Sequence, residues 1–131
     1  MAAKREANDC RVLLADDTPK IRFLVRRVLE VSGGFEVVGE AGDGKQAVAL
    51  AGEMQPDVIL LDLAMPVMDG LQAIPEIRRI APGSKIVVLS GFDENSVYEE
   101  ATTRGASAFL AKGVGPGEIT DTIRRVCALP S

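Results

Sequence analysis

Four short apolar runs, each followed by a polar residue, form the most regular pattern in the sequence. The runs are Val12-Leu13-Leu14-Ala15, Val58-Ile59-Leu60-Leu61, Ile86-Val87-Val88-Leu89 and Ala108-Phe109-Leu110-Ala111. Runs of this length, bounded by polar or turn residues, are typical of buried parallel strands. A further strand is predicted over residues 35–41, after the turn at Ser32-Gly33-Gly34. We therefore expect five strands, the last of them running from Ser107 to Ala111.

The segments between these strands carry apolar residues at helical spacing. In the first segment the apolar side of a helix is formed by Ile21, Leu24, Val25, Val28 and Leu29. Thr18 is a good N-cap and Pro19 suits the first helical position. Arg22, Arg26 and Arg27 would then face the solvent. Comparable patterns predict four more helices, over residues 44–54, 70–80, 93–104 and 116–129.

Strands and helices alternate along the chain without a break that would separate two domains. Five βα units of this length predict an α/β fold, a flavodoxin-like (βα)5 doubly wound parallel sheet of strand order 2-1-3-4-5. Residues 1–10 are predicted to form a flexible N-terminal tail, and residues 11–129 the domain. The chain has 131 residues, 47% hydrophobic and 26% charged, which is enough for one core and argues against global disorder.

Polar residues stand at the carboxyl ends of four of the predicted strands. They are Asp16 and Asp17 after the first strand, Asp62 at the end of the third, Ser90 after the fourth and Lys112 after the fifth. Parallel strands of a doubly wound sheet point their carboxyl ends at one edge, so these side chains should converge. Helix capping would explain one such aspartate, but it does not explain the whole set.

Three carboxylates brought together repel one another unless a cation lies among them. An all-oxygen site with few protein ligands suits Mg²⁺, which prefers one or two carboxylates plus a phosphate oxygen. A carboxylate in such a site can attack phosphorus and form an aspartyl phosphate. A lysine neutralises phosphoryl charge and a serine hydroxyl donates a hydrogen bond to it. The set therefore predicts a phosphoryl-acceptor site.

Net charge, the absence of histidine, the lack of long apolar segments and the cysteine count exclude several classes of function and location. The net charge of −4 argues against a nucleic-acid-binding surface, and the absence of histidine excludes a phosphohistidine on this chain. No apolar run reaches the ~18 residues of a membrane span. Residues 1–6 lack the apolar core of a signal peptide, which indicates the cytoplasm. Cys10 and Cys127 are too few for a disulfide scaffold and are not spaced as metal ligands, so we expect two reduced thiols.

Four segments of the sequence resemble the receiver domain of two-component response regulators. They are Leu14-Ala15-Asp16-Asp17, residues 60–70 with the sequence LLDLAMPVMDG, Val88-Leu89-Ser90-Gly91 and residues 105–112 with the sequence GASAFLAK. The resemblance covers residues 11 to about 128, in the order that the CheY-like family has them. Gly39-Glu40-Ala41-Gly42 and Ser90-Gly91-Phe92 favour the NarL/LuxR-type subgroup, whose receivers often precede a helix-turn-helix domain.

The resemblance implies a role for each residue of the site. Asp62 would be the phosphoacceptor, and Ser90 and Lys112 would contact the phosphoryl group. Mg²⁺ would be bound directly by Asp17 and Asp62 and by the backbone carbonyl of Ala64, and by Asp16 largely through water. Phe109 would be the aromatic switch residue, turning inward as Ser90 moves toward the phosphoryl group, although it could also be an ordinary core residue.

The same resemblance implies the partners and the output. The phosphoryl group would come from a sensor histidine kinase, and the signal would leave through the face made by the fourth helix, fifth strand and fifth helix. That face would bind an output protein or a second copy of the chain, and a phosphotransfer protein that receives the phosphoryl group would be a further partner. We expect no direct binding of nucleic acid or membrane, and no enzymatic activity beyond the chain's own phosphorylation and dephosphorylation.

The sequence departs from the family pattern at three places. Gly113 follows Lys112 where many receivers have a proline in a cis peptide, so a more mobile loop is expected. Ala64 and Phe92 place apolar side chains beside the phosphoacceptor, which is expected to exclude water and lengthen the phosphorylated lifetime. Pro75 lies inside the third predicted helix and should kink or loosen its first turns.

Several alternatives share parts of this pattern. A flavodoxin-type cofactor module has the same fold, but Asp16-Asp17-Thr18-Pro19 would repel a cofactor phosphate. A phosphatase with an aspartyl nucleophile would need a carboxylate at position 64, where the chain has Ala64. A receiver fold that binds partners without phosphate stays open. So does the choice between a stand-alone receiver and one excised from a DNA-binding regulator.

Overall fold

The computed structural model describes residues 9–91 and 95–129 of the chain. The described residues form five strands and five helices in strict alternation. The strands are β1 (Cys10–Ala15), β2 (Phe35–Ala41), β3 (Val58–Asp62), β4 (Lys85–Ser90) and β5 (Ala108–Ala111). The helices are α1 (Pro19–Ser32), α2 (Gly44–Met54), α3 (Gly70–Ile80), α4 (Asn95–Arg104) and α5 (Pro116–Cys127).

All neighbouring strands pair in parallel, in the order β2-β1-β3-β4-β5. The flavodoxin-like fold and its strand order are therefore confirmed. Most element ends differ from the predicted ones by only one or two residues, as is usual where helices fray. The predicted start of the fourth helix at Asp93 lies outside the described residues.

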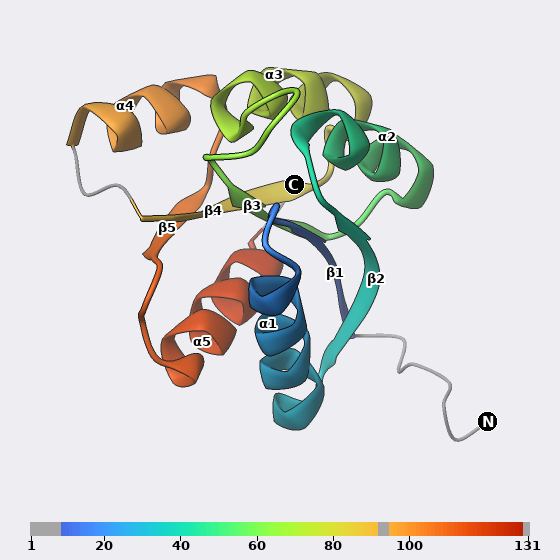
Figure 1. The fold of residues 1–131 in the computed structure, drawn as a ribbon. Helices are drawn as coiled ribbons and strands as arrows, with labels where there is room; N and C mark the ends of the chain where they lie inside the picture. The colour runs from blue at the N-terminus through green and yellow to red at the C-terminus, as the bar shows by residue number, and fades with distance from the viewer. Residues whose placement is uncertain (1–8, 92–94, 130–131) are drawn as a thin grey trace.

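Helices cover both faces of the sheet (Figure 1). Helices α1 and α5 lie on one face, and α2, α3 and α4 on the other. Each face has its own core: Leu29 and Ile123 are buried in the first, and Ile74 and Ile77 in the second. Because β1, β3 and β4 are covered on both sides, their residues are almost all buried, which explains the unbroken apolar runs of the sequence.

The two cysteines do not match the expectation of reduced thiols. Cys10 and Cys127 form a disulfide, with their Cα atoms 6.3 Å apart. Cys10 is the first residue of β1 rather than the end of a tail, and Cys127 is the last residue of α5. A separation of 117 residues gives no hint of the pairing, which exists only because the fold brings the two ends together.

Helix α3 is continuous from Gly70 to Ile80 in spite of the proline within it. Pro75 has no N–H, so the carbonyl of Leu71, one turn earlier, lacks its usual helical donor. The guanidinium of Arg104, at the end of α4, donates a hydrogen bond of 2.9 Å to this carbonyl. A side chain from the neighbouring helix thus supplies the bond that the proline removes.

Among the described residues, no helix combines the length and apolarity that crossing a bilayer requires.

Replacing Arg104 with Met should lower the free energy of unfolding by about 1–2 kcal/mol, because the half-buried Leu71 carbonyl then loses its donor. Adding Pro75→Ala should recover most of that loss, since residue 75 then carries an N–H of its own. Urea denaturation of the two single variants and the double variant measures the coupling. The control is Glu100→Gln, which removes only the exposed ion pair of Arg104. An equal loss in both backgrounds would contradict the pairing.

Candidate functional site

The polar residues predicted at the strand ends converge at the carboxyl edge of the sheet. Asp62 ends β3 and lies beside Leu89 of β4, and Ser90 lies beside Ala111 of β5. Asp16 and Asp17 directly follow β1. The carboxylates of Asp16, Asp17 and Asp62 offer oxygen atoms that all lie within 4.8 Å of one another. The predicted clustering of carboxylates is therefore confirmed.

Two of the three carboxylates are buried, and one lysine faces both of them. Asp62 is 2% exposed and Asp16 is 4% exposed, whereas Asp17 is open to solvent. The ammonium nitrogen of Lys112 lies 3.2 Å from Oδ2 of Asp62 and 3.4 Å from Oδ2 of Asp16. Neither oxygen accepts a well-formed hydrogen bond from a described residue, so the lysine provides their main compensation. One cation thus serves two buried anions.

The electrostatics of the site follow from this crowding. Burial raises the pKa of Asp62, and the nearby charge of Asp16 adds to the effect. The Ala64 N–H and Lys112 act in the opposite direction without cancelling it. Burial by itself would lower the pKa of Lys112, but Asp62 and Asp16 outweigh it, and the net shift is upward. The site therefore favours additional positive charge.

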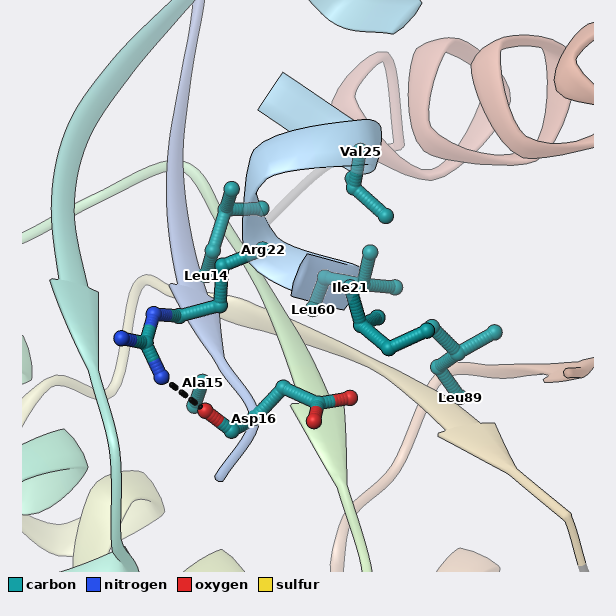
Figure 2. Close-up of a pocket in the computed structure, with 8 residues that line it drawn as sticks. All are labelled: Leu14, Ala15, Asp16, Ile21, Arg22, Val25, Leu60 and Leu89. Carbon is teal, nitrogen blue, oxygen red and sulfur yellow. Dashed lines mark hydrogen bonds between the residues drawn. The ribbon is translucent and has the colours of Figure 1, made fainter. Parts of the chain in front are cut away.

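Asp16 is held in place through its other atoms. The Thr18 N–H donates to Oδ1 of Asp16 over 2.9 Å, and the guanidinium of Arg22 donates to the main-chain oxygen. Figure 2 shows this guanidinium on the main-chain side of Asp16, with the carboxylate pointing away from it. Oδ2 is thereby left to face Lys112 and Asp62. Thr18 occupies the N-cap position of α1 as predicted, but its side chain makes no capping bond.

The prediction that Arg22 and Arg26 face the solvent is wrong, because both side chains are partly buried against Glu40. Their guanidinium groups bind the two carboxylate oxygens of Glu40 at 3.0 and 2.7 Å, and only 19% of the Arg22 side chain is exposed. Burial raises the pKa of Glu40, but the bonds from Arg26 and Arg22 outweigh it and lower it overall. Glu40 pairs with Leu14 in the sheet, two residues before Asp16. Its place at the end of β2 is the signal that could have identified this support.

The loop after β3 folds tightly around Asp62. The Ala64 N–H donates to Oδ1 of Asp62 over 3.2 Å, and the Gly70 N–H donates to the Leu63 carbonyl over 2.9 Å. A Cβ at Gly70 would collide with the Asp62 carbonyl oxygen and lie 2.7 Å from Cα of Leu63. Only glycine allows α3 to start this close to the strand end. The predicted ligand role of the Ala64 carbonyl stays a prediction.

The two residues of the predicted switch belong to the neighbouring strands β4 and β5. Ser90 is buried at the end of β4. Phe109 is half-buried on β5, and its ring lies 4.8 Å from the ring of Tyr98 of α4, tilted by 48°. The aromatic contact connects the edge of the sheet with α4. Phe92, which was expected to shield the site together with the exposed Ala64, lies outside the described residues.

The backbone conformation at residue 113 accounts for the presence of glycine rather than proline after Lys112. It has a φ of 100°, which a proline ring cannot adopt. The described residues contain no cis peptide bond. Lys112 is held by its own N–H, which donates to the Ser90 carbonyl over 2.9 Å, as well as by its two ion pairs. The glycine thus provides a different turn that still places the lysine over Asp62.

Gly70→Ala should lower the free energy of unfolding by about 1–3 kcal/mol, because the new Cβ forces α3 away from the end of β3. The matched control is Gly83→Ala, where nothing lies within 4 Å of the added atom. That control should change stability by less than about 0.5 kcal/mol. Urea denaturation of both variants provides the comparison. Equal losses would show that close approach to Asp62 is not the constraint.

Asp62→Asn should raise the free energy of unfolding at neutral pH in a chelating buffer. Folding raises the Asp62 pKa, so the folded state binds this proton more tightly than the unfolded state does. The wild type then loses stability as the pH rises from the unfolded pKa through the folded one, whereas the amide does not titrate. The gap should be small near pH ~4 and widest near pH ~7. Asp121→Asn, on the exposed side of α5, controls for the lost charge. A constant gap or one of opposite sign would contradict this.

Comparisons with known proteins agree with the geometry. The family description "response regulator receiver domain" matches residues 12–124. Chemotaxis protein CheY of Thermotoga maritima is 35% identical over 116 residues, which cover 88% of this chain and 96% of that protein. Transcriptional regulatory protein LiaR of Bacillus subtilis is 44% identical over 115 residues, which cover 87% of this chain and 54% of LiaR. The chain thus spans about half of LiaR and nearly all of CheY.

Solved structures agree as well. The signal receiver domain of the putative response regulator NarL from Mycobacterium tuberculosis superposes with a TM-score of 0.88 at 37% identity, covering 92% of this chain and 97% of that one. A LuxR-family response regulator from Aurantimonas sp. SI85-9A1 gives a TM-score of 0.87 at 31% identity, with 92% and 86% covered. Sequence, fold and the cluster at the sheet edge lead to one assignment: the chain belongs to the response regulator receiver domain family of two-component systems.

Proposed function

We propose that this receiver accepts a phosphoryl group on Asp62 from a sensor histidine kinase. The observation that carries the proposal is the buried Oδ2 of Asp62, which accepts no well-formed hydrogen bond from the described residues and lies 3.2 Å from the Lys112 ammonium nitrogen. This oxygen attacks phosphorus while the bond from phosphorus to the donor's imidazole nitrogen breaks. Transfer needs positioning and charge neutralisation more than acid–base help, and the site provides both.

Mg²⁺ is the cofactor that the donor set fits. Asp16 and Asp62 each have one carboxylate oxygen that accepts no well-formed hydrogen bond within the described part of the chain. Carboxylate oxygens of these two residues and of the exposed Asp17 lie within 4.8 Å of one another. Hard oxygen donors and partial access to water suit this ion. The ligands would be Asp17, Asp62 and the Ala64 carbonyl, with Asp16 acting largely through water. Bound Mg²⁺ would neutralise the carboxylates and the incoming phosphoryl oxygens.

Lys112 and Ser90 complete the acceptor. The Lys112 ammonium group lies 3.2 Å from Oδ2 of Asp62. After phosphorylation it would pair with a phosphoryl oxygen in place of that carboxylate oxygen. The hydroxyl of Ser90, on the neighbouring strand, would donate a hydrogen bond to another oxygen. Phosphorylation would thus shift charge-assisted bonds from Asp16 and Asp62 toward the phosphoryl group. A change of this kind can favour one arrangement of the surrounding loops.

The output face would be formed by α4, β5 and α5. Phe109 contacts the Tyr98 ring, and the two stand between the sheet edge and α4. A movement of Ser90 toward the phosphoryl group would let Phe109 pack inward and free space near Val97, Tyr98 and Ala101. A downstream protein or a second copy would bind there, whereas a phosphotransfer protein would have to reach Asp62 itself. A few kcal/mol of differential interaction is enough to change which arrangement dominates.

The kinase would approach beside Lys112. An apolar groove of about 370 Å³ reaches this lysine between α1 and the start of α5, with Leu24, Val28 and Val114 among its lining residues. Leu24 is 50% exposed and its neighbour Phe23 is 60% exposed, so a partner could bury both.

Phosphotransfer would take place in the cytoplasm, and the chain would have no catalytic activity toward other substrates.

A second candidate is a receiver that controls an attached output domain. It is favoured by relatives such as LiaR, a transcriptional regulatory protein about twice as long as the matched segment. In such a protein the same chemistry at Asp62 would control a neighbouring domain through the α4, β5 and α5 face. The acceptor chemistry is common to both candidates.

Asp62→Asn should abolish labelling by acetyl phosphate, because an amide of nearly the same shape cannot attack phosphorus. Intact-protein mass spectrometry measures the phosphoryl adduct. Asp57→Asn, which removes an exposed carboxylate just before the other end of β3, should be labelled like the wild type. Excess chelator or Asp17→Asn should suppress labelling of the wild type by about tenfold or more. An adduct in Asp62→Asn, or undiminished labelling in chelator, would overturn the proposal.

Ser90→Ala should separate phosphorylation from output. Beryllofluoride, which stands in for the phosphoryl group, should change amide hydrogen exchange in α4 and β5 of the wild type. In Ser90→Ala the change should shrink severalfold, since one phosphoryl contact is lost. Ser107→Ala, on the exposed residue before β5, is the control and should respond fully. Exchange changes confined to the surroundings of Asp62 would show that this output face is wrong.

A further inference from the structure

The disulfide lies far from the acceptor chemistry and has no part in it. Cys10 begins β1 and Cys127 ends α5, so the bond lies at the amino edge of the sheet, opposite Asp62. We propose that Cys10 and Cys127 form a reversible thiol–disulfide pair, a redox modification site that fixes or releases the C-terminal end of α5.

The two sulfur atoms differ in their access to solvent. Cys10 is 5% exposed, whereas Cys127 is half-buried and therefore open to a small reagent. This asymmetry suits a pair in which one sulfur reacts first and the other resolves the mixed product. The first atom to react would be the sulfur of Cys127. Cys10, held in the sheet by a hydrogen bond of 2.9 Å from its N–H to Gly34, is the resolving residue.

A carboxylate lies close to the two sulfur atoms and helps to hold the strand that carries Cys10. An Asp57 carboxylate oxygen and the two sulfur atoms lie within 4.8 Å of one another. That side chain already accepts a hydrogen bond of 2.9 Å from the Arg11 N–H, and the Asp57 N–H donates to the Arg11 carbonyl. Asp57 therefore ties β1 to the start of β3.

This end of α5 is held by the buried side chain of Val126, which is 1% exposed, and by polar contacts that are weak and exposed. The Arg124 guanidinium lies 5.0 Å from the centre of the Phe35 ring and donates to the Ser32 hydroxyl over 3.0 Å. The Lys85 ammonium donates to the Leu129 carbonyl over 3.2 Å. Contacts of this kind contribute little each, whereas a covalent bond between the two ends of the domain restricts the helix strongly. Oxidation would thus add a covalent restraint to the last turn of α5, beyond its packing on the core.

The oxidation balances with a low-molecular-weight disulfide as the oxidant. The Cys127 thiolate attacks that disulfide, forms a mixed disulfide and releases one small thiol. The Cys10 thiolate then attacks the Cys127 sulfur and releases the second small thiol. The two cysteine protons end on the two released thiols. Reversibility, though not the pairing, rests on the proposed function, which places the chain in a reducing cytoplasm where disulfides are transient.

Thiol trapping in glutathione buffers tests the pair without any phosphorylation. The full chain is equilibrated over a range of glutathione disulfide to glutathione ratios, alkylated and weighed intact. Oxidising buffers should give an unalkylated monomer about 2 Da lighter than the reduced chain, and reducing buffers a doubly alkylated one. Double alkylation at every ratio, glutathione held on Cys127 alone or a disulfide-linked dimer would each overturn the proposal.

Amide hydrogen exchange tests the effect on the helix. In the wild type, oxidation should slow exchange in the last turns of α5 by about tenfold or more. Cys127→Ser should exchange like the reduced wild type in both buffers, and it should still be labelled on Asp62. Equal exchange in oxidised and reduced wild type would overturn the control of α5. Failure of the acceptor function would appear only in the labelling, so the two proposals fail separately.

Discussion

Two like charges buried next to each other are the constraint on which this domain depends. Asp16 and Asp62 are almost completely inaccessible, and a single partly exposed ammonium group faces both of them. Carboxylates in this position are stable only while positive charge stays close. The loop after β5 is shaped to hold Lys112 over them. The same shortage of positive charge is the physical reason for proposing a metal ion at this edge.

Hydrogen bonds and close packing hold the backbone around these charges in place. The pair formed by Arg22 and Glu40 secures the backbone of Asp16 from one side, and Gly70 lets α3 close over the end of β3 from the other. None of these residues supplies the reacting atom. They fix the distances at which the two buried carboxylates share the Lys112 ammonium group.

The fold and the acidic cluster could be predicted because both follow from position along strands. An apolar run fixes a buried strand, and parallel topology brings the ends of such strands to one edge. The disulfide, the Arg22–Glu40 pair and the bond from Arg104 to Leu71 could not be predicted in the same way. Each of them joins residues that meet only after helices have packed on the sheet, and local pattern carries no record of that packing. The sequence indicates that Gly113 stands where many receivers have a proline. Its positive φ, however, could be recognised only from the folded turn after β5.

The proline in α3 has a consequence for the motion of its neighbour. The Leu71 carbonyl of α3 accepts its hydrogen bond from the Arg104 side chain, so one backbone group of α3 is satisfied by a residue of α4. Any displacement of the end of α4 must break that bond or carry α3 along with it. The proline therefore acts as a latch between two helices on the same face of the sheet. A single hydrogen bond sets its strength at about 1 kcal/mol, enough to bias a resting position and small enough for thermal motion to release.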